Sequence, residues 1–256
     1  MPMKISIITV CFNAEKTLSS AIRSVQEQDY DDIEYIVVDG GSSDRTVETA
    51  NEFENVIACF ISEPDDGIYD AMNKGIARAT GEVVGILNAD DFYPNAHVVS
   101  SVASHFEEAS KVSMVLGNVD FVLSDELNKP VRNYSSFKFS PWKMRFGFMP
   151  AHPAAFIKMS AFESVGNYKL GYKIGADFDI FVRMLVVEKL PYIKVNENFV
   201  RMRLGGVSTS GVASYITTTK EILRSLKENN IYSNYGMVLL RLPIKFVQLL
   251  FSKWNR

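Results

Sequence analysis

The chain has 256 residues, 47% of them hydrophobic and 22% charged, and a net charge of −3. This composition suits one large α/β domain, or one domain with a small appendage, and excludes a general polyanion partner such as nucleic acid. Two cysteines and no bilayer-length apolar run or signal peptide lead us to expect a reduced, cytoplasmic protein without a disulfide framework or metal cluster.

The first ninety residues alternate between strand and helix patterns. Apolar and β-branched runs predict strands, Asn13 is expected to cap the first helix, and a second helix is expected near Arg45. This order predicts a Rossmann-like α/β fold with a mostly parallel sheet flanked by helices. The predicted strands are 4–10, 34–39, 56–62 and 83–87, and the third helix is 68–79.

An acidic pair, Asp90 and Asp91, directly follows the fourth predicted strand. Open α/β sheets bind ligands at the carboxyl ends of their strands, where Asn13 and Asp39 are also expected. Two adjacent carboxylates suit a divalent cation that carries a diphosphate, because Mg²⁺ is commonly held by one or two carboxylates and phosphate oxygens. The alternative is a polar turn before Pro94.

Asp39 has two interpretations: a hydrogen-bond acceptor for a base or ribose, or a turn aspartate before Gly40. Neither the dinucleotide-binding glycine fingerprint nor a Walker A lysine motif follows any predicted strand. A phosphate here is therefore expected to be neutralised by metal.

Three motifs resemble family 2 inverting glycosyltransferases of the GT-A fold, as found in bacterial polysaccharide and O-antigen biosynthesis. They are IITVCFN, VVDGGSSDRT and EPDDGIYDAMNKGIARATGEVVGILNADD. The resemblance is close over about the first hundred residues and looser to about residue 210. It implies a nucleotide-sugar donor, Mn²⁺ or Mg²⁺, and metal ligation by Asp91, the direct ligand, and Asp90. The donor-binding residues that it implies are Thr9, Cys11, Asn13, Asp39, Ser42, Asp66, Asn73, Lys74, Asn88 and Asp90.

The segment 65–74 has its own alternatives. Asp66 and Gly67 suit a tight turn, whereas the resemblance places the loop against the ribose and diphosphate. Lys74 is either a phosphate neighbour or a solvated lysine.

Residues 95–212 are expected to bind the acceptor. A strand over 114–123 pairs with 129–134, and an aromatic-rich stretch precedes Pro150. His152 is structural or, by the resemblance, a site residue.

A helical apolar stripe in 171–185 carries Asp177 and Asp179 at its start. Helix capping explains both acids. An inverting transfer also needs a carboxylate base, and by the resemblance Asp177 is that base, with Asp179 the second choice. The family has a Glu-Asp pair here, but this chain has Ala176 in the first place.

A last strand over 195–203 carries Arg201 and Arg203. The resemblance suggests that they meet the diphosphate, whereas the sequence alone makes them strand surface charges.

The predicted domain covers 1–212, as a nucleotide-sugar half 1–94 and an acceptor half 95–212, and a helical tail covers 213–256. In the tail, 214–227 is helical and 237–254 is very apolar, with a polar stripe that begins at Arg241. From Gly236 onward there are four basic residues and no acidic one. This pattern predicts peripheral binding to the inner face of the cytoplasmic membrane, or packing on the domain or in a homodimer.

The resulting hypothesis is inverting transfer of a sugar, from a UDP-sugar as the expected donor, to a hydroxyl of a glycan or polyprenyl-linked saccharide. A nucleotidyltransferase is the enzymatic alternative. The other alternative is an inactive binding protein of the same fold, and Ala176, in place of the expected glutamate, favours it.

Overall fold

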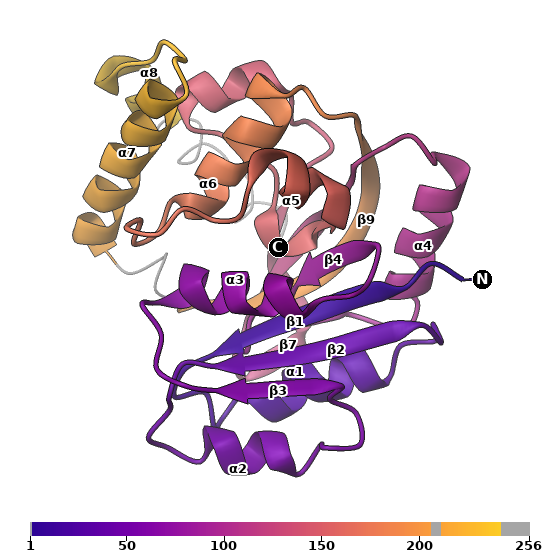
Figure 1. The fold of residues 1–256 in the computed structure, drawn as a ribbon. Helices are drawn as coiled ribbons and strands as arrows, with labels where there is room; N and C mark the ends of the chain where they lie inside the picture. The colour runs from indigo at the N-terminus through magenta and orange to yellow at the C-terminus, as the bar shows by residue number, and fades with distance from the viewer. Residues whose placement is uncertain (1, 206–210, 242–256) are drawn as a thin grey trace.

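The computed structural model describes residues 2–205 and 211–241, excluding the side chains of 211–213. The first half alternates strands and helices as expected (Figure 1). Its elements are β1 (Ile5–Cys11), α1 (Leu18–Gln26), β2 (Ile33–Asp39), α2 (Thr46–Asn51), β3 (Cys59–Ser62), α3 (Ile68–Arg78), β4 (Val83–Ile86), β5 (Asp91–Phe92) and α4 (Val98–Glu108).

The second half begins with a hairpin and ends in helices. Its elements are β6 (Met114–Leu123), β7 (Glu126–Tyr134), η1 (Pro141–Phe146), η2 (His152–Ala154), β8 (Ala155–Lys158), α5 (Met159–Val165), α6 (Ala176–Phe181), the π-helix η3 (Val182–Val187), β9 (Tyr192–Arg203), α7 (Gly211–Glu228) and α8 (Tyr235–Leu239).

The strand order is β3-β2-β1-β4-β8-β6-β9-β5, and β7 pairs with the outer part of β6. The first four strands are parallel, as predicted. Strand β8 then runs antiparallel to both β4 and β6, and β5 runs antiparallel to β9. The α/β class is confirmed, but the sheet is mixed rather than mostly parallel, because β8 re-enters it in the opposite direction.

Two apolar cores cover the two faces of the sheet. Successive side chains of a strand point to opposite faces, so Ile7 of β1 joins the core under α1 and α4 while Ile8 joins the core under α3. The second core continues through α5 and α6 to Ile222 and Leu226 of α7. The described part of the tail therefore packs on the domain.

One local prediction was wrong. Helix α1 begins at Leu18, with Thr17 rather than Asn13 at its N-cap, and Asn13, two residues after β1, adopts a left-handed φ of 50°. Asp91 lies in the short strand β5, paired with Met202, and its N–H donates to the Asn88 carbonyl at 3.0 Å.

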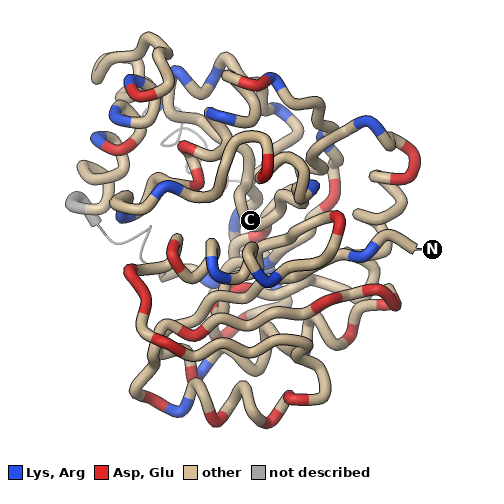
Figure 2. The backbone as a smooth tube through the Cα atoms, in the orientation of Figure 1, with Lys and Arg blue, Asp and Glu red and all other residues tan. Residues whose placement is uncertain are grey.

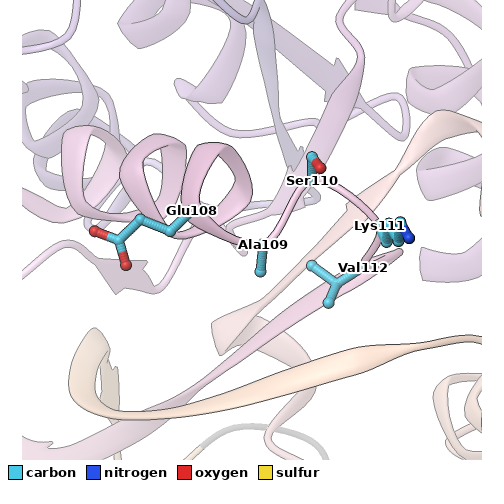
Figure 3. Close-up of a pocket in the computed structure, with 5 residues that line it drawn as sticks. All are labelled: Glu108, Ala109, Ser110, Lys111 and Val112. Atoms are coloured by element: carbon cyan, nitrogen blue, oxygen red, sulfur yellow. The ribbon is translucent and has the colours of Figure 1, made fainter.

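Two surface hollows lie away from the strand ends that carry the predicted site. One, of ≈ 240 Å³, is at the turn between α4 and β6 and is lined by 108–112 (Figure 3). It lies at the opposite edge of the sheet, since β6 there pairs with the part of β8 beside the start of β4. The other, of ≈ 590 Å³, lies between α7 and residues 230–235.

In the described part of the chain, no helix combines the length and the apolar character that crossing a bilayer requires.

Candidate active site

The carboxyl ends of β1, β2 and β3 lie together at the left-hand edge of the sheet in Figure 1. The register aligns Cys11 with Asp39 and Asp39 with Ser62, so the segments that follow these strands meet. Acidic residues mark this edge in Figure 2. This is the edge at which open α/β sheets bind ligands.

Asp39 organises the loop after β2. Its side chain is completely buried and accepts hydrogen bonds from the Gly41 and Ser42 backbone N–H groups, at 3.2 and 3.1 Å, and from the Ser42 and Ser62 hydroxyls. These donors occupy both carboxylate oxygens. Asp39 therefore shapes the turn after β2 at the carboxyl ends of the strands.

The other predicted residues at this edge connect β1 to the same loop. The backbone N–H of Asn13 donates to the Ser42 hydroxyl at 2.7 Å, and its side-chain oxygen accepts from the Ser43 N–H at 2.9 Å. Thr9 is buried and accepts from the Tyr35 hydroxyl at 2.9 Å. Burial and the carboxylate of Asp39 raise the pKa of the Cys11 thiol, so it stays neutral. These side chains connect β1 to β2 and to the loop after β2, and so shape the candidate site.

Phe12 is a candidate site residue that the sequence analysis did not select. It follows β1 at the same edge, and 64% of its side chain is exposed. A large exposed ring is suited to stacking on a planar ligand. The signal was present in the sequence, as an aromatic residue between the end of a buried strand and Asn13.

The loop between β3 and α3 brings a second carboxylate to the edge. Asp65 is half-buried and lies against Gly40, where an added Cβ would overlap its carboxylate. Asp66 is exposed, and its N–H donates to the Asp70 carboxylate at 3.2 Å. Of Asp65 and Asp66, Asp65 is therefore the one that lies against the loop after β2.

Asn73 and Lys74 of α3 each have partners within the protein. The Asn73 amide makes two hydrogen bonds to the backbone of Tyr168, at 2.8 and 3.0 Å. Lys74 is held between Glu63 and Asp70, at 3.0 and 3.3 Å. The favourable partners of these side chains are other parts of the protein, which helical spacing could not indicate.

The acidic pair after β4 contains unsatisfied oxygens. Asp91 is completely buried, and its Oδ1 has no partner, while its Oδ2 accepts from the Asn88 amide at 3.3 Å. Asn88 Oδ1 is also buried without a partner. Burial and the neighbouring Asp90 raise the pKa of Asp91. Of the two carboxylates, Asp90 is the more accessible.

This arrangement fits a divalent cation. Among the described residues, no three His, Cys, Asp or Glu side chains are placed to hold a metal by themselves. Mg²⁺ and Mn²⁺ sites for phosphate esters need fewer, because phosphate oxygens and water complete the coordination. The carboxylates of Asp90 and Asp91 and the amide oxygen of Asn88 are the oxygen donors available here.

Arg203 lies against the acidic pair. Its guanidinium donates to the Asp90 carbonyl at 2.6 Å and to the Ser20 hydroxyl at 2.8 Å, and packs over Phe92. Arg201 makes only long contacts near Asn128, at 3.4 Å, and its buried Nε has no partner. Both arginines lie on β9 beside β5, which begins at Asp91. They are therefore more than surface charges on a strand, which was the interpretation from the sequence alone.

A second region of the site surrounds Asp177, at the start of α6. The Asp177 Oδ1 accepts from the Phe178 N–H at 2.7 Å, and the Tyr69 hydroxyl donates to the Ile174 carbonyl, three residues before Asp177. Tyr69 lies in the first turn of α3, directly after the loop that carries Asp65. Helix α3 therefore connects the strand-end crevice to Asp177.

The environment of Asp177 changes its acidity. Burial raises its pKa to about 7, helped by the charge of Glu221 and opposed by hydrogen bonds from the backbone and Tyr69. Burial raises the pKa of Tyr134 and of Tyr168, and the charge of the Asp177 carboxylate adds to both shifts. A half-buried carboxylate with a pKa near neutrality can accept a proton at physiological pH.

Asp179 and His152 do not share this setting. Asp179 is completely buried and paired with Lys169 at 3.2 Å and Arg183 at 2.8 Å. His152 is buried with its Nε2 2.7 Å from the Tyr168 hydroxyl, and burial lowers its pKa to about 4, so it is neutral. Both side chains are occupied in packing, and the geometry gives neither a direct contact with an acceptor.

Arg132 also escaped the sequence analysis. Its guanidinium packs 3.8 Å from the centre of the Phe121 ring, and its buried Nε has no partner. Arg132 lies on β7 opposite Phe121 of β6, and this pairing of the two strands was predicted from the sequence.

Comparison with known proteins identifies the family. The model of the family described as glycosyl transferase family 2 matches residues 6–166, which is more than half of the chain. The chain belongs to glycosyltransferase family 2. A PGL/p-HBAD biosynthesis glycosyltransferase of Mycobacterium bovis is 28% identical over 265 residues, covering 98% of this chain and 91% of that protein.

Solved structures support the GT-A fold of this family 2 chain. The TarS 1–349 fragment of S. aureus, crystallised with UDP-GlcNAc, superimposes with a TM-score of 0.69 at 17% identity over 88% of this chain. The alignment covers 66% of that fragment, so this chain spans just under two thirds of it. The mannosyltransferase PcManGT of Pyrobaculum calidifontis, in complex with GDP-Man and Mn²⁺, gives a TM-score of 0.64 at 17% identity, over 99% of this chain and 74% of that one.

Proposed function

We propose that this family 2 glycosyltransferase transfers a sugar, with inversion, from a UDP-sugar to a hydroxyl of a lipid-linked saccharide or glycolipid. The observation that carries the proposal is Asp177, a carboxylate with a pKa raised to about 7 that is connected by α3 to the acidic strand-end crevice. The name of the M. bovis relative supports a glycolipid pathway, and the UDP-GlcNAc bound by TarS supports a uridine donor.

In this mechanism the acceptor hydroxyl oxygen bonds to the anomeric carbon of the donor while the bond from that carbon to the diphosphate oxygen breaks. Asp177 takes the hydroxyl proton. The nucleoside diphosphate leaves from the opposite face, so the anomeric configuration inverts.

Asp90 and Asp91 are proposed to hold Mn²⁺ or Mg²⁺, and Asp90 is the more accessible of the two carboxylates. A bound ion would neutralise the charge that develops on the leaving diphosphate. Arg203 holds the Asp90 backbone in position. Phe12 and the loop after β2 are proposed to receive the nucleoside.

Calorimetric titration with UDP, GDP and dTDP, each in Mn²⁺ and in EDTA, tests the donor site. We expect metal-dependent binding of UDP that Asp90→Ala abolishes. The matched control is Asp125→Ala, which removes an exposed carboxylate from the turn between β6 and β7. If none of the three nucleotides binds the wild-type protein, the proposal is wrong.

Product analysis separates the enzymatic alternatives. With a UDP-sugar and a polyprenyl-linked acceptor, a glycosyltransferase releases UDP and forms a product of inverted anomeric configuration, which NMR detects. A nucleotidyltransferase would release pyrophosphate instead. An inactive binding protein would bind UDP but release nothing.

The tail is proposed to hold the protein peripherally at the inner face of the membrane, near a lipid-linked acceptor. Leu239 and Leu240 are exposed at its start, with 41% and 52% of their side chains accessible. The residues that follow, 242–256, lie outside the described part of the chain and add three basic side chains and no acidic one. Apolar and basic residues together suit an anionic membrane surface.

A further inference from the structure

Glu221 of α7 lies beneath the loop that leads into α6. Its carboxylate accepts hydrogen bonds from three successive backbone N–H groups, those of Lys173 at 2.7 Å, Ile174 at 2.9 Å and Gly175 at 2.8 Å. Only 9% of Glu221 is exposed. Asp177 follows two residues later, so one carboxylate fixes the backbone from which the proposed base projects.

The loop is shaped to receive this carboxylate. Gly175 faces Glu221 so closely that an added Cβ would lie 3.0 Å from the Glu221 Cβ, and Ala176 is completely buried. Position 176 is alanine, so the carboxylate beside this turn comes from α7 rather than from the residue before Asp177.

The Gly175 N–H is buried and those of Lys173 and Ile174 are part-buried, and such groups need hydrogen-bond acceptors in the folded protein. Residues 173–175 receive theirs from an element more than forty residues away in the sequence. The direction of the Asp177 carboxylate therefore depends on the docking of α7.

We infer that Glu221 is a positioning residue for the proposed base, holding the 173–175 loop so that the Asp177 carboxylate faces the acceptor. The inference rests on the proposed function, since it assigns Glu221 a role through Asp177. On this inference α7, which belongs to the helical tail, contributes to catalysis by positioning Asp177.

The charged and titratable groups around Asp177 come from several elements. Glu221 faces it from α7, Tyr69 from α3, Tyr134 from β7 and Tyr168 from the loop after α5. The tyrosines are neutral at physiological pH because burial raises their pKa values. Glu221 is thus the negative neighbour among these groups, and its charge raises the pKa of Asp177.

The test measures the ionisation of Asp177 and turnover in the same variants. Aspartate is labelled with ¹³C at the carboxyl carbon, the Asp177 signal is assigned by its loss in Asp177→Asn, and its titration midpoint is measured. Turnover is the release of UDP from UDP-glucose and UDP-N-acetylglucosamine between pH 5 and 9. The variants are Glu221→Gln, which removes the charge, and Glu221→Asp, which keeps the charge but shortens the side chain.

The matched control is Glu228→Gln. Glu228 lies on the same helix and anchors it through Lys169 at 3.0 Å and the Tyr172 hydroxyl at 3.1 Å, without touching residues 173–175. It reports what loosening α7 alone does to titration and turnover.

We expect Glu221→Gln to move the Asp177 midpoint, and the acid limb of the rate profile, to lower pH. We also expect turnover at the optimum to fall about 10- to 100-fold, because a misplaced base loses near-attack geometry. Glu221→Asp should keep the higher midpoint and still lose turnover, whereas Glu228→Gln should change neither.

Two results overturn the inference in distinguishable ways. If Glu221→Gln and Glu221→Asp both match Glu228→Gln in midpoint and turnover, Glu221 only docks α7, and the proposed base stands. If Asp177→Asn turns over at the wild-type rate, the base assignment is wrong, and the role of Glu221 falls with it.

Discussion

Asp177 is held in a setting that opposes its own ionisation. Its ordinary pKa is 3.8, and burial raises it to about 7. A folded-state pKa above the unfolded one means that the folded protein binds the proton more tightly than the unfolded chain does. The contribution of Asp177 to stability is therefore greatest below about pH 4, and it is lost as the pH rises through about 7.

Asp177→Asn should consequently separate activity from stability. A neutral amide removes the cost of ionisation, so we expect a larger free energy of unfolding than wild type above pH 7, by about 2–4 kcal/mol. The difference should shrink towards zero as the pH falls to about 4. Turnover should drop about 10²- to 10⁴-fold, as expected for the loss of a general base.

Urea denaturation at pH 8.5 and at pH 4.5 measures the stability effect. A difference of equal size at both pH values would mean that the substitution acts through packing. The wild-type acid limb of the kcat/KM profile should lie near pH 7.

Thr9, Asn73 and Lys74 were predicted to bind the donor, and all three have partners within the protein. Hydrogen bonds between distant segments decide where a polar side chain points, and no local pattern encodes those bonds.

Helix α6 illustrates how an element depends on its neighbours. It has six residues before the chain continues as a π-helix, and isolated helices of this length are not stable in water. Asp179 anchors it by accepting from Arg183 at 2.8 Å, Ser225 at 2.8 Å and Asn229 at 3.1 Å. The sequence predicted acidic residues in the first turn of this helix, but it did not predict that Asp179 bonds to residues of α7.

Asp179→Asn should therefore destabilise the fold rather than change the chemistry. It leaves the Lys169 and Arg183 cations without their buried partner, which typically costs about 3–5 kcal/mol. Urea denaturation measures the loss, with Asp125→Asn as the control on an exposed acid.

The acid limb of the rate profile should remain near pH 7 in the Asp179→Asn protein that stays folded. Unchanged stability with abolished turnover would instead make Asp179 the base.

At the scale of the whole molecule, the tail begins as part of the domain. Val238 is completely buried in the core that contains α6 and α7, and Arg241 is 3% exposed, donating to the Thr219 hydroxyl at 2.8 Å. The polar stripe expected to face headgroups thus starts, at Arg241, against the protein. The rest of the stripe lies outside the described residues.

A truncation after Arg241 tests membrane binding without removing this packing. We expect the 1–241 protein to keep its melting temperature and UDP affinity but to stop sedimenting with anionic phosphatidylglycerol vesicles. Neutral phosphatidylcholine vesicles are the control for charge.

A second truncation after Asn234 should lower the melting temperature, because it removes Val238 and Arg241. If the 1–241 protein still binds anionic vesicles as the full chain does, residues 242–256 are not the membrane contact. A change in its oligomeric state would assign them to a dimer.

The sequence alone determined the class of fold, the family and the parallel direction of the first four strands. Buried parallel strands and amphipathic helices leave periodic apolar patterns in the chain itself, and the motifs at the strand ends are contiguous. The boundaries of β6, Met114–Leu123, were correct to the residue for the same reason.

Only the tertiary structure decided the reversal of β8, the short strand β5 at Asp91 and the support of Asp177 by Glu221. Each depends on contacts between segments far apart in the chain, whose energy comes from hydrogen bonds and burial that exist only once the elements have packed. Residue types and their spacing pointed to Asp177, but its raised pKa arises from desolvation and from a charge on α7, which are properties of the folded molecule.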